Sequence, residues 1–238
     1  MDTGNTENTF REYTDVSDLR AALYRLFAIA FRFPTAEVIT ELKSKGRSLA
    51  LLDMMGEVYS VMPGTSETIR LLKKTILTYG DSMDLRVEYA RLFIGPFHLP
   101  APPYESVYRD GSGHLLMGQS TLEVRRSYRE EGLDLSDTVR DLPDHVIAEM
   151  EFMSHLCETE SCLRTANRSE AEMYLGKQEN FLSEHLTKWI PGFTQAICSS
   201  TDVEFYRLLA QCANDFISLD HDYVRMLICE PSRRGCGE

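Results

Sequence analysis

Apolar residues recur at intervals of three and four along almost the whole chain. Leu19, Leu23, Leu26, Phe27 and Ala30 mark one face of a helix that ends near Phe33–Pro34. The same spacing returns over 38–42, 51–62, 69–77, 85–93, 146–157, 175–189 and 206–217. No run of four or more residues alternates convincingly between apolar and polar, as a half-buried strand would. The pattern predicts an all-α protein of about ten helices.

Polar residues at the edges of these stripes predict where helices begin and end. In a capping box, a Ser or Thr at the start of a helix is followed three residues later by Glu. Three pairs have this spacing: Ser120 with Glu123, Ser169 with Glu172, and Thr201 with Glu204. Gly132 predicts the end of the helix that begins near Ser120.

One polar stretch, over 133–141, separates the helical pattern into two parts. It predicts a hinge between an N-terminal helical lobe, 15–132, and a C-terminal helical lobe, 142–228. The chain ends, 1–14 and 229–238, are predicted to be flexible tails. The resulting architecture is a helical bundle in two lobes.

The segment 95–106 cannot be helical throughout, because it carries four prolines in eight positions. It is unusually apolar for a loop, with Phe97, Leu99 and Tyr104. One interpretation is a rigid connector packed over the core. The other is a preformed surface that binds a peptide at low entropic cost. Composition favours neither.

Composition and charge narrow the function classes. Hydrophobic residues make up 43 % of the 238 residues, so the chain can form a substantial core. A formal net charge of −12 argues against nucleic acid, whose affinity for proteins comes mainly from Lys and Arg. The polar, acidic start is unlike a signal peptide, and no apolar run reaches the roughly 18 residues of a membrane span. We therefore expect a cytoplasmic protein without membrane insertion, whose six cysteines are reduced thiols.

No motif for nucleotide binding, zinc hydrolysis or a serine nucleophile is present. His145 with Glu149, and Glu151 with His155, stand four apart on one predicted helix. They could ligate a metal, but no second set appears, and surface pairs are the commoner explanation. We expect no catalytic residue and no metal site. Asp144, at the start of this helix, is either an ordinary helix-dipole contact or part of an acidic patch that faces a bound chain.

Three segments together point to a known family: EYARLFIGP over 88–96, APPYESVY over 101–108, and LPDH over 142–145. With these motifs in this order, the chain resembles the TorD/DmsD family of redox-enzyme maturation chaperones. The resemblance covers roughly residues 18 to 220.

The resemblance implies a non-enzymatic cytoplasmic chaperone. Family members bind the apo-form and twin-arginine signal peptide of a molybdopterin-dependent oxidoreductase, and assist cofactor insertion and export proofreading. The chain itself is then expected to hold no cofactor, since the molybdopterin belongs to the client, and weak GTP binding follows by family analogy only. Family members are monomers or domain-swapped homodimers, with 133–141 as the plausible exchange point here. Which molybdoenzyme is the client is not apparent.

The resemblance also implies a peptide-binding site. The matching positions are Tyr89, Leu92, Phe93, Pro103, Tyr104, Glu105, Ser106, Asp144 and His145. Family members often have a Glu shortly before the Asp-His pair, whereas here the nearest upstream acid is Asp141. A basic, apolar leader needs an apolar groove with a carboxylate rim, for which Glu105, Asp141 and Asp144 are the candidates. Two alternatives remain: a structural or assembly subunit of an oxidoreductase complex, and a helical metal-dependent enzyme that uses the His/Glu pairs.

Overall fold

The computed structural model describes residues 16–44, 47–58, 65–78, 83–95, 98–109, 116–134 and 141–229. The predicted tails lie outside this part of the chain, except for Cys229, which is the last residue of a helix, and so do residues 135–140 of the predicted hinge.

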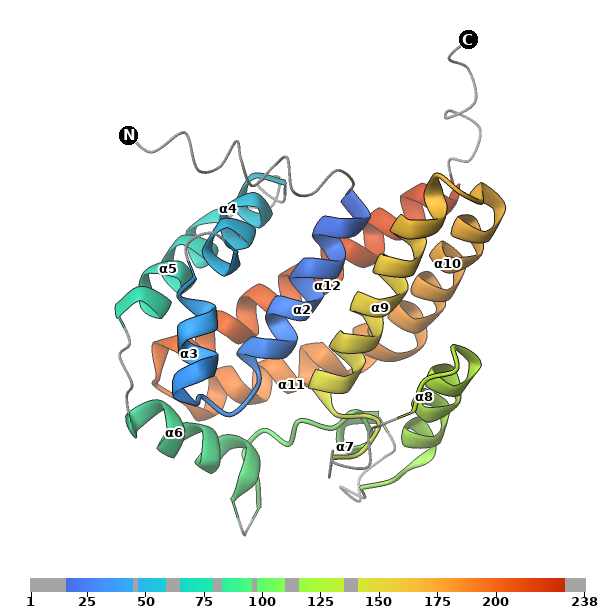
Figure 1. Cartoon of the computed structure of the whole chain (residues 1–238). Helices are drawn as coiled ribbons and strands as arrows, with labels where there is room; N and C mark the ends of the chain where they lie inside the picture. The colour runs from blue at the N-terminus through green and yellow to red at the C-terminus, as the bar shows by residue number, and fades with distance from the viewer. Residues whose placement is uncertain are drawn as a thin grey trace, which may run out of the picture.

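The described residues form α-helices joined by short connections (Figure 1). The α-helices are α2 (Val16–Ala30), α3 (Ala36–Leu42), α4 (Ser48–Val58), α5 (Thr65–Thr78), α6 (Met83–Tyr89), α7 (Glu105–Arg109), α8 (Gln119–Glu130), α9 (Val146–Arg164), α10 (Arg168–Phe181), α11 (Thr187–Ser200) and α12 (Glu204–Cys229). Two π-helical turns extend them: η1 (Ala90–Ile94) continues α6, and η2 (Leu182–Leu186) joins α10 to α11. In the described ranges the one β pairing is an isolated bridge. The all-α prediction is confirmed.

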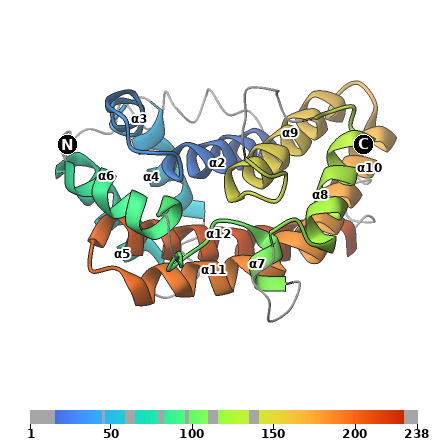
Figure 2. The ribbon, with the colours of Figure 1, turned by 90° about the horizontal axis from the view of Figure 1, so that it is seen from below.

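Helix α2 lies at the centre of the protein. It runs antiparallel to α9, and in Figure 2 these two helices form one layer above α11 and α12. Buried residues cover most of its circumference, from Ser17 through Leu23 to Ala30, while Asp18, Ala22 and Arg25 form a face that is not buried. A helix that is buried on most sides belongs to the interior of a fold. The sequence predicted one apolar face, whereas the structure buries most of the circumference.

The core continues from the first described helix to the last. Buried apolar residues from Leu19 on α2 to Val224 on α12 belong to one cluster. Helix α5 packs on α12 and α4, while α10 packs on α9 and α12. The two predicted lobes therefore share a core in this structure, and the position of a hinge between them stays a prediction.

A buried ionic cluster ties α2 to α12. The guanidinium of Arg20, 1 % exposed, donates to Asp220 Oδ2 at 2.9 Å, and the Tyr24 hydroxyl donates to the same oxygen at 2.7 Å. Glu160 accepts from Arg20 at 3.4 Å and from the Gln178 side chain at 3.0 Å. Buried charges of this kind are stable only when paired. Nothing in the local sequence distinguishes Arg20 from an exposed arginine.

Two of the predicted capping boxes are wrong. Helix α8 begins after Gly118, so Ser120 lies inside the helix and is buried. Helix α10 is capped by Asn167, whose side chain accepts from the Glu170 amide at 3.3 Å. Before α12, Thr201 Oγ1 accepts from the Val203 amide at 3.0 Å, one residue short of the predicted contact. The predicted stop at Gly132 is confirmed by its φ of +70°, a conformation that suits glycine.

Candidate binding groove

The proline-rich segment and the start of α9 lie side by side, although their residues are about 40 positions apart in the sequence. An antiparallel bridge pairs Tyr104 with His145. The Glu105 amide donates to the Asp144 carbonyl at 3.0 Å, and the Val146 amide donates to the Pro103 carbonyl at 3.0 Å. These backbone bonds fix the loop to the end of the helix, so two of the three family motifs form one surface.

The side chain of Asp144 adds a further hydrogen bond between the proline-rich segment and the start of α9. This side chain is fully buried, and its Oδ2 accepts from the Ser106 amide at 3.0 Å, in the first turn of α7. Helix α9 is capped instead by His145, whose Nδ1 accepts from the Ile147 amide at 3.1 Å. Neither interpretation of Asp144 drawn from the sequence included this hydrogen bond to α7. The carboxylate stabilises the start of α7, because a capping acceptor satisfies a free helix amide.

A groove of about 800 Å³ opens next to the junction. Five of the predicted residues line it: Tyr89, Phe93, Pro103, Tyr104 and His145. The expected rim acid Asp141 also lines the groove and is exposed. Leu99 of the proline-rich segment, which the sequence offered as a possible peptide-binding surface, lines it as well. Seven further lining residues were not predicted: Arg32, Phe33, Ile94, Leu116, Ile147, Ala148 and Glu151.

Several of the missed residues are apolar and exposed. Phe33, Ile94 and Leu116 are 39 %, 58 % and 53 % exposed, so the groove presents an apolar surface to solvent. Ala148 and Glu151 could have been found, because they follow His145 at helical spacing on the same face of α9. No such pattern in the sequence points to Arg32 and Phe33, because they follow α2 and are far from the other lining residues in the sequence.

Four predicted residues do not line the groove. Leu92, Glu105, Ser106 and Asp144 are at most 1 % exposed, so the protein itself encloses them. The expectation that Glu105 and Asp144 form an exposed acidic rim is wrong, because both carboxylates are used inside the protein. The acids at the groove surface are Asp141 and Glu151. Whether the buried four affect client binding stays a prediction.

The polar groups of the groove have defined charge states. Burial lowers the pKa of His145 below its usual 6.5, against the opposing effect of Asp141, Asp144 and Glu151. The imidazole is therefore neutral at neutral pH. The Tyr104 hydroxyl donates to Asp141 at 3.3 Å, and its ring contacts that of His145 edge-on at 5.1 Å between centroids. Burial and the Asp141 carboxylate raise the pKa of Tyr104 to about 12.

Below the groove, a second set of ionisable groups anchors α7 to the core. Glu105 accepts from Arg109 at 2.6 Å and lies 3.0 Å from Nδ1 of His185. Glu149, also fully buried, accepts from the Trp189 indole at 3.0 Å. Burial and then the neighbouring Glu105 carboxylate raise the pKa of Glu149 well above 4.5. Its environment thus favours the protonated form of Glu149. The interpretation of His145 and Glu149 as a surface pair is wrong, because both are buried.

We expect Glu149→Gln to gain stability relative to the parent protein as the pH rises. Above 4.5 the unfolded chain releases a proton that folded Glu149 retains, so the parent loses stability with rising pH until the folded-state pKa is reached. A neutral glutamine has no such proton, and its amide oxygen can still accept from Trp189. Urea unfolding at about pH 5 and about pH 8 measures the effect, with a relative gain of roughly 1 kcal/mol or more at the higher pH. An equal difference between variant and parent at both pH values would contradict it.

In the described part of the chain, no three or more His, Cys, Asp or Glu side chains are grouped so that they could bind a metal ion. Nor does any described helix combine the length and apolar character needed to cross a membrane.

Comparison with known proteins gives consistent results. Residues 60–195 match the family model described as nitrate reductase delta subunit. A chaperone protein TorD from Psychrobacter sp. (strain PRwf-1) is 30 % identical over 190 residues, which cover 78 % of this chain and 82 % of the relative. The TorD chaperone of Vibrio parahaemolyticus is 23 % identical over 214 residues, 90 % of this chain and 98 % of the relative.

A solved structure from Archaeoglobus fulgidus, described as a redox enzyme maturation protein, has the same fold. It superposes with a TM-score of 0.52 over 83 % of this chain and 93 % of its own, at 22 % identity. The family match spans more than half of the chain and includes most of the groove. The chain belongs to the TorD/DmsD family of redox-enzyme maturation chaperones.

Proposed function

We propose that this protein is a cytoplasmic, non-catalytic chaperone that binds the twin-arginine leader of a molybdoenzyme precursor in the groove between α6–η1, the proline-rich segment and α9. The precursor is held while its molybdenum cofactor is inserted, and the chaperone itself carries none. The observation that supports this best is the groove itself, an exposed apolar surface bordered by two carboxylates.

The chemistry of the groove suits such a leader. Apolar leader residues would cover Phe33, Ile94 and Leu116, whose burial is favourable by roughly 25 cal/mol per Å². The leader arginines would meet Asp141 and Glu151, which are exposed and so attract cations without a large desolvation cost. Neutral His145 adds no repulsion toward these cations.

Calorimetric titration with three synthetic peptides tests the proposal. The first is the twin-arginine leader of a molybdoenzyme precursor, the second has both arginines replaced by Gln, and the third has its apolar segment replaced by Ser. We expect the first to bind most tightly, and its advantage over the second to shrink as salt is raised, because exposed charges are screened. Equal binding of all three, or none, would contradict the proposal.

The family model's description as a subunit favours a second candidate, a component that stays with the mature enzyme. The two functions differ in what happens after cofactor insertion. A chaperone should leave the complex when the client acquires its cofactor, whereas a subunit should co-elute with the mature enzyme in size-exclusion chromatography.

A further inference from the structure

One carboxylate of the groove is already paired with an arginine of the same chain. Arg32, just after α2, places Nη2 2.6 Å from Glu151 Oε1 on α9. Both residues line the groove, and their side chains are 46 % and 49 % exposed. They are separated by 119 positions in the sequence, so the contact depends on the packing of α2 against α9.

Arg32 is also the one cation among the described residues that line the groove. The other charged lining residues are Asp141 and Glu151, and His145 is neutral. Next to Arg32, Phe33 contributes an exposed ring to the same surface. The chain therefore already presents a guanidinium and an aromatic side chain to the groove, the same classes of side chain that an arginine-containing apolar peptide would present.

We propose that Glu151 is the guanidinium-binding carboxylate of the groove, and that Arg32 occupies it in the free chaperone in place of a peptide arginine. A bound arginine displaces Arg32 from Glu151, and Arg32 thereby lowers the affinity for arginine-bearing peptides. This inference rests on the proposed function, because it concerns the same groove.

The exposure of the pair makes the exchange feasible. Half-exposed ion pairs are weak, so separating Arg32 from Glu151 costs little. The displaced guanidinium can extend into solvent, while Glu151 exchanges one guanidinium for another. The internal pair thus keeps the carboxylate occupied without closing the groove, and it selects against ligands that cannot replace the guanidinium.

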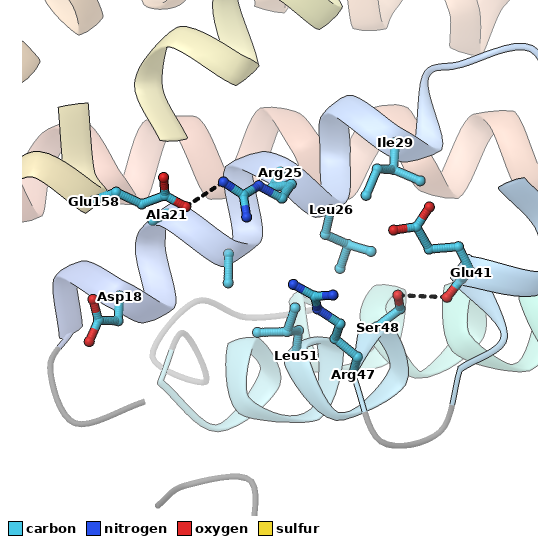
Figure 3. A pocket seen from close by; sticks show the side chains of 11 residues that line it. Asp18, Ala21, Arg25, Leu26, Ile29, Glu41, Arg47, Ser48, Leu51 and Glu158 are labelled. Atoms are coloured by element: carbon cyan, nitrogen blue, oxygen red, sulfur yellow. Dashed lines mark hydrogen bonds and ion pairs between the residues drawn. The ribbon is translucent and has the colours of Figure 1, made fainter. Parts of the chain in front are cut away.

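The same two helices provide a matched control. Arg25 on α2 is paired with Glu158 on α9, with side chains 49 % and 44 % exposed. This pair lines a separate pocket of about 230 Å³ between α2, α4 and α9 (Figure 3). Arg25→Gln changes the net charge as Arg32→Gln does, at a residue that also pairs with a glutamate of α9 and has similar exposure, but outside the groove.

The test is calorimetric titration of a synthetic twin-arginine leader peptide into the parent protein and its variants at low salt. We expect Arg32→Gln to tighten binding by about two- to fivefold relative to Arg25→Gln, because it frees Glu151. Glu151→Gln should weaken binding by about three- to tenfold relative to Glu158→Gln. In the double variant Arg32→Gln/Glu151→Gln, the gain from Arg32→Gln should disappear, since the two residues act on one interaction.

Three results would overturn the inference. Arg32→Gln and Arg25→Gln could raise the affinity equally, which would show only a general charge effect. Arg32→Gln could weaken binding, which would make Arg32 a contact for the peptide. The gain could also persist in the Glu151→Gln background. If the parent protein does not bind the peptide at all, the proposed function fails first, and this outcome is distinct from the other three.

Discussion

Arg20→Met is expected to lower the free energy of unfolding by about 3–5 kcal/mol, the range for breaking a buried ion pair by removing one partner. The variant leaves Asp220 fully buried, with the Tyr24 hydroxyl at 2.7 Å as the remaining donor in the described part of the chain, and removes one donor to Glu160. An uncompensated buried carboxylate is costly, whereas methionine restores the aliphatic volume of the arginine. Urea unfolding followed by circular dichroism measures the change.

The control for this prediction is Arg25, which lies further along α2. Arg25→Met breaks the half-exposed pair with Glu158 and should cost less than about 1 kcal/mol. Adding Asp220→Leu to Arg20→Met should recover part of the loss, because it removes the unpaired charge. If Arg20→Met were as mild as Arg25→Met, the buried cluster would not contribute to the stability of the α2–α12 contact.

Tyr104→Ala is expected to weaken leader binding by about 2 kcal/mol or more, roughly thirtyfold, as for a rigid aromatic anchor at the centre of an interface. Tyr104 stands between the apolar and acidic parts of the groove. Its half-buried ring contacts His145, and its hydroxyl donates to Asp141. Alanine removes the ring, while the backbone bridge to His145 can remain. Calorimetric titration with the twin-arginine leader peptide is the measurement.

Two further variants separate the contributions to this effect. Tyr104→Phe keeps the ring and loses only the bond to Asp141, so it should cost less than about 1 kcal/mol of binding energy. Tyr174→Ala removes a partly exposed tyrosine of α10 outside the groove, next to Lys177, and should leave binding unchanged. If folded Tyr104→Ala bound the leader as tightly as the parent protein, the leader would bind elsewhere and the proline-rich segment would be structural.

The helical class of this protein could be predicted from its sequence because helical periodicity is a local property. The spacing from Leu19 to Ala30 predicted α2, and Gly132 marked the end of α8, since each depends on residues within a few turns. Individual helix starts were less predictable. Asn167 caps α10 in place of Ser169, because more than one polar residue near a helix start can provide the capping oxygen.

About half of the residues that line the groove could be predicted from the sequence in the same way. The motifs around Tyr89, Phe93, Tyr104 and His145 pointed to residues that the structure does bring together. The acids were assigned less well. Glu105 and Asp144 are buried and Glu151 is exposed, and whether a carboxylate faces solvent or the amide of another helix depends on packing.

The residue pattern along the chain was enough to predict its helical class, the interruption of the helices by the proline-rich segment, and the motifs that relate it to its family. Which charges pair depends on the tertiary structure. Arg20, Arg25 and Arg32 all lie on or next to α2. Arg20 is buried and pairs with Asp220, whereas Arg25 and Arg32 are half-exposed and pair with glutamates of α9. Their partners are 200, 133 and 119 positions away. Contacts at such separations arise when helices pack, and the local pattern along the chain does not specify them.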